Sequence, residues 1–223
     1  MTNVEFLIEK RSKSYLILEL FQFFPKMSEH KTKIVLIGDS GVGKTSLVTK
    51  WIRNTYKDDQ EPTIGASYLQ SVMEINGEPH KIQIWDTAGE EKYRTMMPIY
   101  SQGASGALLV FDLTREQTME HVPQWIECIC CEKVPIVVAG NKADIDEREI
   151  SYPTAQKFCE NLGLHYIETS AHNGMGVDEA FTQLIKKAIE YQQNNSAESS
   201  LNTVDIANGE GNERKGGDGK SCC

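Results

Sequence analysis

The segment Gly38-Asp39-Ser40-Gly41-Val42-Gly43-Lys44-Thr45 decides the fold of this chain. It matches the phosphate-binding pattern G-x-x-x-x-G-K-[ST] at every fixed position. The apolar run Lys33–Ile37 precedes it and predicts a buried strand, and Ser46-Leu47-Val48 follows and can begin a helix. The glycines let backbone N–H groups turn toward a phosphate, Lys44 can reach the outer phosphates, and the Thr45 hydroxyl can bind Mg²⁺. The flanking strand and helix disfavour the alternative, a simple glycine-rich turn.

Length and charge limit the possible functions. The chain has 223 residues, which predicts one domain of ordinary size with tails, and 39% of them are hydrophobic, enough for a core. With 23 basic and 32 acidic residues the formal charge is −9, and the pI is near 5.1. An acidic surface disfavours nucleic acid as the main partner, because phosphate backbones bind basic surfaces. A single loop can still bind a nucleotide.

The six cysteines show neither a disulfide framework nor the paired C-x-x-C spacing of a zinc site. Three of them fall in a segment with helical periodicity and are expected to be small core or groove side chains, which fits a reducing, cytosolic setting. No run reaches the roughly 18 apolar residues of a membrane-spanning helix. The cysteines are Cys128, Cys130, Cys131, Cys159, Cys222 and Cys223.

From Lys33 onward, apolar runs alternate with amphipathic segments. Runs without internal alternation indicate a parallel sheet covered on both faces, and Asn76-Gly77 indicates a hairpin that adds one antiparallel strand. We therefore predict an α/β fold with a doubly wound, mostly parallel six-stranded sheet. The predicted strands are Lys33–Gly38, Tyr68–Ile75, His80–Trp85, Gly106–Asp112, Pro135–Gly140 and His165–Glu168, and the predicted helices are Thr45–Asn54, one around Met119–Cys131, Tyr152–Asn161 and Val177–Tyr191.

The two ends differ in composition from residues 31–191, the predicted main domain. Residues 1–30 form an N-terminal extension with a short apolar stretch, Tyr15–Phe24, and Met27 would be a natural start. We expect residues 1–26 to be an upstream extension, and the alternative is an amphipathic helix that binds a partner or a membrane surface. Residues 192–223 are rich in Asn, Ser, Gly, Glu and Lys and predict a flexible tail.

Three further segments follow at strand ends. Asp86, in Trp85-Asp86-Thr87-Ala88-Gly89, is a carboxylate that can hold Mg²⁺, and Gly89 can offer its N–H to a terminal phosphate. Asn141-Lys142-Ala143-Asp144 follows a buried strand, at the edge where α/β sheets bind ligands. The Asp144 carboxylate can accept hydrogen bonds from N1–H and the amine of guanine, and adenine would leave it unpaired. Thr169-Ser170-Ala171 could bring a backbone N–H to the guanine carbonyl.

Through these motifs the sequence resembles the small Ras-like GTPases, and within them the Rab proteins, over about Lys33 to Tyr191. The resemblance implies the P-loop GTPase fold, GTP and GDP binding with Mg²⁺, hydrolysis of GTP to GDP, and a role as a switch in vesicle traffic. Segments similar to Rab proteins are Ile64–Tyr68, Lys81–Trp85, Tyr93-Arg94-Thr95, Leu109–Thr114 and Ser221-Cys222-Cys223.

The resemblance assigns roles residue by residue. Thr63 would bind Mg²⁺ and the γ-phosphate only in the GTP form, Tyr56 would pack on the guanine edge, and the two switches would be roughly Tyr56–Gly65 and Gly89–Gln102. The metal ligands would be Thr45, Thr63 and Asp86. The catalytic residues would be Glu90 and Lys44. The expected GTP-binding residues are Ser40, Gly41, Val42, Gly43, Lys44, Thr45, Ser46, Tyr56, Thr63, Gly89, Asn141, Lys142, Asp144, Ser170, Ala171 and His172.

The resemblance also implies partners and a location. Trp85 and Tyr93, with an aromatic near Tyr100, look like the patch that Rab effectors contact. Cys222 and Cys223 resemble the twin cysteines that carry geranylgeranyl groups, and two chains give stable anchoring where one does not. We expect a monomer that meets effector, exchange-factor, GTPase-activating and GDI-type proteins, with no nucleic acid. It would sit on the cytoplasmic face of an endomembrane, endosomal or another vesicle, and cycle with the cytosol.

Two positions depart from the family pattern. Glu90 stands where a glutamine is usual. An ionised glutamate accepts a hydrogen bond from the attacking water but cannot donate one toward the γ-phosphate, so we expect slow intrinsic hydrolysis. The alternative is that Glu90 acts as a general base. His172 stands where a lysine usually helps to cover the base, which predicts a somewhat lower nucleotide affinity.

Three functions compete on the sequence alone. The first is a GTP-hydrolysing switch in membrane traffic. The second is a GTP-bound scaffold with negligible intrinsic hydrolysis, which Glu90 favours. The third is an ATP-using P-loop kinase, which Asn141-Lys142-Ala143-Asp144 disfavours.

Overall fold

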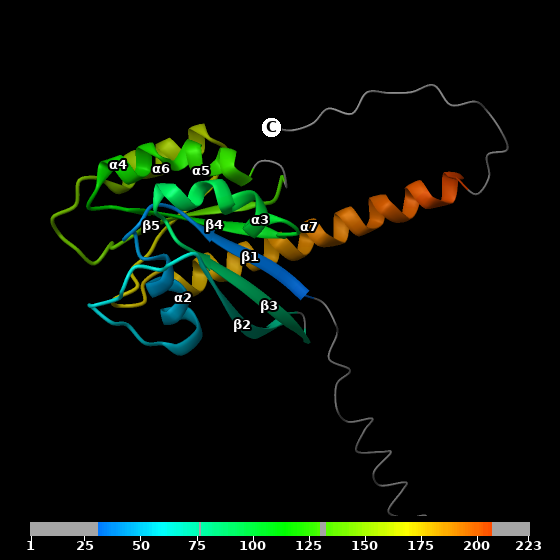
Figure 1. The fold of residues 1–223 in the computed structure, drawn as a ribbon, viewed down its shortest axis with the longest axis horizontal. Helices are drawn as coiled ribbons and strands as arrows, with labels where there is room; N and C mark the ends of the chain where they lie inside the picture. Colours follow the sequence, from blue (N-terminus) through cyan, green and yellow to red (C-terminus); the bar gives the residue numbers. More distant parts are fainter. Residues whose placement is uncertain (1–30, 76, 130–132, 207–223) are drawn as a thin grey trace, which may run out of the picture.

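The structure is a computed structural model that describes residues 31–75, 77–129 and 133–206, with side chains up to residue 196. Its centre is a six-stranded sheet in the order β2-β3-β1-β4-β5-β6 (Figure 1). The strands are β1 (Lys31–Ile37), β2 (Ala66–Ile75), β3 (Glu78–Thr87), β4 (Gly106–Asp112), β5 (Ile136–Asn141) and β6 (His165–Glu168).

The pairing of the strands confirms the predicted α/β fold. β2 and β3 are antiparallel, with Ala66 opposite Thr87 and Ile75 opposite Glu78, whereas all the other pairs are parallel. Gly77, in the predicted turn, has φ +81°, which is the left-handed conformation that a tight hairpin needs. Asn76 lies outside the described residues. Every residue of β4 is buried, as expected of a central strand covered on both faces.

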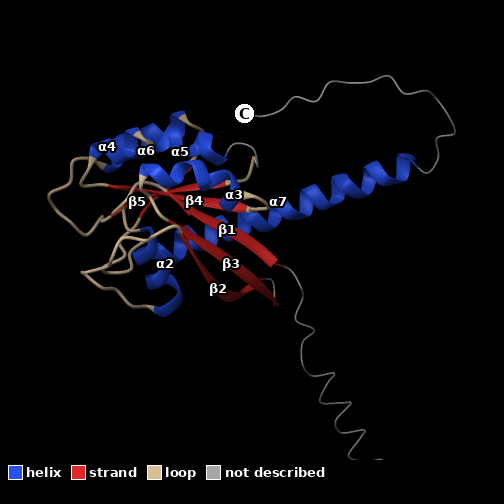
Figure 2. Cartoon of the chain, in the orientation of Figure 1, coloured by secondary structure: helices blue, strands red, loops and turns tan. Residues whose placement is uncertain are grey.

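Helices cover both faces of the sheet, as Figure 2 shows. Side chains alternate along β1, so Ile34 and Leu36 enter one core and Val35 and Ile37 enter the other. The first core lies under α2 and α7, and the second lies under α3, α4, α5 and α6. The helical segments are α2 (Lys44–Arg53), the 3₁₀ helix η1 (Glu91–Met96), α3 (Met97–Ser101), α4 (Glu116–Glu120), α5 (Val122–Ile129), α6 (Tyr152–Asn161) and α7 (Val177–Ile206).

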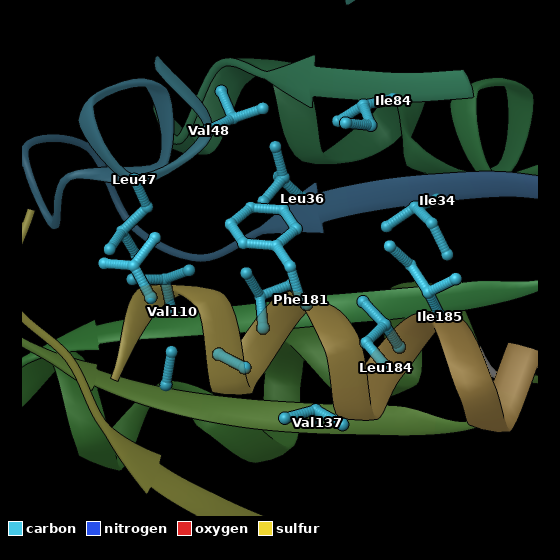
Figure 3. Packing of buried hydrophobic residues seen from close by; sticks show 14 of the residues in the cluster. Ile34, Leu36, Leu47, Val48, Ile84, Val110, Val137, Phe181, Leu184 and Ile185 are labelled. Atoms are coloured by element: carbon cyan, nitrogen blue, oxygen red, sulfur yellow. The ribbon is translucent and has the colours of Figure 1, made fainter. Parts of the chain in front are cut away.

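Phe181 of α7 is central to the first core (Figure 3). It is 1% exposed, and its ring stacks on Trp51 of α2 with centroids 4.5 Å apart. This stack fixes α2, and with it the end of the phosphate loop, against α7. The packing therefore supports the phosphate loop through α7, a helix that carries none of the nucleotide-binding motifs.

Three elements differ from the prediction. The helix expected around Met119–Cys131 is two helices, α4 and α5, because Pro123 lacks an N–H and its ring clashes with the preceding turn. Cys130 and Cys131 lie outside the described residues. The second predicted switch, Gly89–Gln102, contains η1 and α3, which the sequence analysis did not anticipate.

The last helix is longer than predicted. It continues beyond Tyr191 to Ile206, where a flexible tail was expected from residue 192. No glycine or proline interrupts the sequence before Gly209, so nothing breaks the helical hydrogen-bond ladder. Gln192 also ties this part of α7 to the sheet, because its Nε2 donates to the Lys31 carbonyl oxygen at 2.8 Å and its Oε1 accepts from the Thr32 hydroxyl at 3.0 Å.

Candidate functional site

The phosphate loop joins β1 to α2 at the carboxyl edge of the sheet. Gly38, Gly41 and Gly43 have φ of +134°, +75° and +96°, which side chains other than glycine rarely adopt. A Cβ on Gly38 would lie 2.1 Å from the Val110 carbonyl oxygen, so the loop also needs glycine for close packing on β4. Gly43 immediately precedes α2, whose N-terminal amides provide an anion site.

Lys44 is the buried cation of the loop. Its side chain folds back so that Nζ donates to the carbonyl oxygens of Gly38 at 2.7 Å and Asp39 at 2.8 Å. Burial lowers the pKa of Lys44 to about 8, although the charges of Asp86 and Asp39 partly oppose this. Bound phosphates would favour the charged ammonium and would compensate for its burial.

Three oxygen-bearing side chains meet beside Lys44. The Thr45 hydroxyl donates to Asp86 Oδ2 at 2.6 Å, and it lies 2.7 Å from the Thr63 hydroxyl. Asp86 is fully buried, its Oδ1 has no hydrogen-bond partner among the described residues, and desolvation raises its pKa. Oxygen ligands with one carboxylate, completed by substrate phosphates, suit Mg²⁺. The residues therefore fit the ion that the sequence predicted here.

The predicted base site lies at the ends of β5 and β6. Asn141 connects it to the phosphate loop, because Nδ2 donates to the Val42 carbonyl oxygen at 2.8 Å and Oδ1 accepts from the Ala171 N–H at 3.3 Å. Lys142 is oriented by an ion pair of 2.7 Å with Asp112, a carboxylate with no exposed surface. The motif is thus rigidly attached to the loops on either side.

Asp144 and its neighbours form the outer part of the base site. The Ser170 hydroxyl donates to Asp144 Oδ1, and His172 Nδ1 lies 3.6 Å from Asp144 Oδ2. The rings of Tyr56 and His172 meet edge to face with centroids 5.2 Å apart. One carboxylate and two rings therefore face the region between the first switch and the loop after β6.

Most of these residues line one cavity of about 240 Å³. Among the predicted binding residues, Val42 and Ser170 are buried behind its wall, and Asp86 lies behind Thr45. Ile145 and Thr87 also line it, and Thr87 follows Asp86 directly. The predicted residues in the wall are Ser40, Gly41, Gly43, Lys44, Thr45, Ser46, Tyr56, Thr63, Gly89, Asn141, Lys142, Asp144, Ala171 and His172. Lining residues that were not singled out are Lys57, Asp58, Gln60, Glu61 and Pro62, all within the predicted first switch.

Glu90 is outside the cavity wall. Its carboxylate forms an ion pair of 2.7 Å with Lys92, with side-chain exposures of 38% and 63%. Glu90 precedes η1 in an extended conformation, and its carbonyl oxygen accepts from the Tyr93 N–H at 2.9 Å. The carboxylate is therefore held by a neighbouring cation on the surface.

The predicted aromatic patch is only partly as expected. Trp85 contacts Tyr68 at 5.9 Å and Tyr100 at 6.3 Å between ring centroids, so Tyr68 is a member that the sequence analysis missed. Tyr93 instead lies beneath the Lys92 ammonium, 5.0 Å from its ring centroid. Tyr68 lies directly opposite Trp85 in the antiparallel pair, and this cross-strand position is the signal that could have identified it.

The remaining cysteines carry no site in the described part of the chain. Cys128 is half-buried, and Cys159 is buried among apolar side chains, which raises the pKa of its thiol to about 12. Cys222 and Cys223 lie outside the described residues, so lipidation stays a prediction. Within residues 31–75, 77–129 and 133–206, no helix combines the length and apolar character needed to cross a bilayer.

A phosphate loop, a strand-end aspartate and Asn-Lys-Ala-Asp on one edge of this sheet are the defining features of guanine-nucleotide-binding P-loop proteins. Comparison with known proteins agrees. The Ras family model matches residues 33–190. The chain is 37% identical over 206 residues to Ras-related protein YPTC6 of Chlamydomonas reinhardtii, covering 86% of this chain and 94% of that protein. It is 38% identical over 200 residues to Ras-related protein Rab-25 of Bos taurus, covering 86% and 92%.

A third relative, Ras-related protein RABA4a of Arabidopsis thaliana, is 41% identical over 157 residues, which is 69% of this chain and 70% of that protein. The chain therefore belongs to the Ras family of small GTPases, and within it to the Rab proteins. Proteins of this kind are GTP-binding switches in vesicle traffic. This membership removes the ATP-using kinase from the possible functions.

Proposed function

We propose that this chain binds GTP and GDP with Mg²⁺ in the cavity described above and hydrolyses GTP slowly, as a Rab-type switch. The observation that carries the proposal is the meeting of Thr45, Thr63 and Asp86 within hydrogen-bond distance. Thr63 comes from the first switch, Thr45 from the phosphate loop and Asp86 from β3. A site built from three separate segments can report whether a terminal phosphate is present.

Each group has a role in binding. Lys44 and the amides at the start of α2 neutralise the phosphates. Thr45 and Thr63 would hold Mg²⁺, with Asp86 behind Thr45, and the bound ion would supply positive charge that offsets the charge of the phosphates. Gly89 offers its N–H to the γ-phosphate. When that phosphate leaves, Thr63 and Gly89 lose a partner and both switches are released.

Guanine selectivity rests on Asp144. Its carboxylate accepts from N1–H and the 2-amino group of guanine, and adenine has neither donor in that place, which leaves a polar group unpaired. The Ser170 hydroxyl holds one carboxylate oxygen and so orients the group. Tyr56, from the first switch, and His172, from the loop after β6, close the base site.

Slow hydrolysis is proposed from Glu90. In-line attack of water on the γ-phosphate needs a residue that orients the water without repelling phosphate oxygens. Glu90 carries a negative charge, lacks a donor when ionised and is paired with Lys92 away from the cavity wall. The second candidate function is a GTP-bound scaffold. It would result if the charge of Glu90 reduced the hydrolysis rate almost to zero.

The membrane end of the proposal concerns Cys222 and Cys223. Two geranylgeranyl chains on these thiols would hold the protein on the cytoplasmic face of an endomembrane, where the half-exposed Trp85, Tyr68 and Tyr100 patch would meet effectors. Removal by a GDI-type protein would return it to the cytosol. Mass spectrometry of protein from cells, compared with a Cys222→Ser/Cys223→Ser variant, tests the modification.

The first experiment measures the nucleotide released from purified protein, and then its conversion after loading with GTP and Mg²⁺. Guanine nucleotide with slow, steady conversion to GDP supports the switch. GTP that persists for many hours supports the scaffold. Adenine nucleotide, or no nucleotide at all, overturns the proposed binding site.

A further inference from the structure

The side chain of Asp39 joins the phosphate loop to the second switch. Asp39 is the second residue of the loop, and its side chain turns away from the cavity, toward α5, η1 and His121 at the end of α4. Asp39 Oδ1 accepts from Trp125 Nε1 at 2.7 Å and from Arg94 Nη2 at 3.3 Å, and Oδ2 lies 2.7 Å from His121 Nδ1. We call these four residues, Asp39, Arg94, His121 and Trp125, the Asp39 cluster.

The cluster is partly shielded from water. The side chains of Asp39 and Arg94 are 15% and 20% exposed, and Trp125 is 1% exposed. The Arg94 guanidinium lies over the Trp125 ring, 4.8 Å from its centroid, and its Nη1 donates to Gln124 Oε1 at 2.8 Å. A charged pair in such a setting is screened less than one on an open surface. Arg94 is therefore fixed by a carboxylate, an aromatic face and an amide at once.

Two points of the second switch touch Asp39, and Glu90 lies between them. Arg94 contacts its carboxylate. At the other end, a Cβ on Gly89 would lie 2.2 Å from the Asp39 carbonyl carbon and 2.4 Å from the Ser40 nitrogen, so the backbones are in close contact. Four residues separate Gly89 from Arg94. The backbone between them forms a turn, in which the Tyr93 N–H donates to the Glu90 carbonyl oxygen.

Asp39 also contacts the phosphate-binding lysine. Its carbonyl oxygen accepts from Lys44 Nζ at 2.8 Å, while its carboxylate holds Arg94. Asp39 therefore contacts Lys44, the expected phosphate-binding residue, through its backbone and contacts Arg94 of the second switch through its side chain. A single residue joins these two contacts.

We propose that Asp39 is a positioning residue that clamps Arg94 against the phosphate loop and thereby holds Gly89 in place for the γ-phosphate. The inference rests on the proposed nucleotide site. It assigns to Asp39 and Arg94 a contribution to the GTP form only, because GDP has no γ-phosphate for Gly89 to contact. Asp39 itself does not touch the nucleotide through its side chain.

The test compares dissociation rates of labelled GTP analogue and labelled GDP from the full chain with Mg²⁺. Asp39→Asn keeps the size of the side chain and an acceptor for Trp125 but removes the charge that holds Arg94. Arg94→Gln removes the same pair from the other side. Each should raise the ratio of GTP-analogue to GDP dissociation rates roughly tenfold, the order expected for loss of a charge-assisted hydrogen bond. The double variant should show no further increase, because both changes remove one interaction.

Gln124→Ala is the matched control. It removes the hydrogen bond that Arg94 makes to Gln124, an exposed residue for which the described residues show no hydrogen bond to the loop, and it should leave the ratio within about twofold of wild type. Arg94→Lys keeps the positive charge but loses the two-pronged guanidinium donor. Its ratio should therefore lie between those of wild type and Arg94→Gln. An unchanged ratio in Arg94→Gln, or additive effects in the double variant, overturns the inference.

Folding defects are separated from positioning by the GDP rate. A variant that only loosens the loop speeds release of both nucleotides equally and leaves the ratio unchanged, which counts against the proposal. If Asp39→Asn does not fold, Arg94→Gln, Arg94→Lys and Gln124→Ala decide the question alone. Failure of wild-type protein to bind guanine nucleotide would instead refute the proposed function, and so the two failures differ.

Discussion

Replacing Glu90 by glutamine should accelerate single-turnover hydrolysis of GTP. The change keeps the length of the side chain, removes a negative charge and adds an N–H donor that can point toward the γ-phosphate. It also breaks the surface ion pair with Lys92. That pair is exposed on both sides and is screened by water, so its loss should have little effect on stability.

The magnitude follows from the charge. To orient water, Glu90 must approach the γ-phosphate, and two unit charges about 5 Å apart repel by about 3 kcal/mol at an effective dielectric constant of about 20. Relief of that repulsion corresponds to a rate increase of about 160-fold as an upper bound. Partial screening by Mg²⁺ and solvent reduces it, so we expect an increase of roughly 10- to 100-fold.

The assay follows phosphate release after GTP-loaded protein is mixed with excess Mg²⁺, so that nucleotide exchange does not contribute. Glu91→Gln is the matched control, because Glu91 is an exposed neighbour that carries the same charge. Its rate should stay within about twofold of wild type. A Glu90→Gln variant no faster than wild type would refute the assignment of slow hydrolysis to this residue. An equal gain in Glu91→Gln would show a general charge effect.

Three further predictions concern the loop and the core. Binding of GDP at pH 8 should take up about half a proton, because the pKa of Lys44 is about 8 in the empty site and bound phosphate raises it. The affinity for GDP should then fall as the pH rises above 8. Calorimetry in two buffers of different ionisation enthalpy measures this uptake, and none at pH 8 contradicts the prediction. Gly89→Ala should weaken GTP binding at least about tenfold relative to GDP binding, since the added Cβ would lie 2.2 Å from the Asp39 carbonyl carbon. An equal loss of affinity for both nucleotides in a competition assay would argue against this. Phe181→Ala should cost about 3–5 kcal/mol of unfolding free energy in urea at fixed GDP, through loss of burial and of the Trp51 stack, and a loss below about 1 kcal/mol would contradict it.

The sequence was sufficient for the sheet because the strands carry strong local signals. Gly106–Asp112 and His165–Glu168 have the predicted bounds, since continuous apolar residues are bounded by polar or glycine residues at each end. The antiparallel hairpin followed from a turn that only a few residues can form. Motif positions then placed the cavity at the carboxyl edge of the sheet, where its wall is found.

Elements without a periodic apolar pattern were missed. None of the residues in η1 (Glu91–Met96) is buried, so the sequence offered no helical stripe there. The part of the wall that the first switch contributes between Tyr56 and Thr63 has no motif, and only its place in that switch associates it with the site; its residues are Lys57, Asp58, Gln60, Glu61 and Pro62. The Asp39 cluster joins residues 55, 82 and 86 positions apart, and contacts at such distance along the chain depend on the fold and on no local pattern.

In the proposed membrane-anchored form, the extension of α7 would change how far and in which direction the domain can move. Gln192 fastens the helix beside the start of β1, at the opposite edge of the sheet from the cavity, and 14 more helical residues extend about 20 Å beyond that point (Figure 1). A coil of the same length would let the domain explore a sphere around its anchor. A helical rod would instead keep the nucleotide edge of the sheet remote from the end of α7. In the proposed lipidated form, the helix would therefore separate the switches from the C-terminal end of the described chain, and partners would meet the switches at the end of the domain remote from the helix tip.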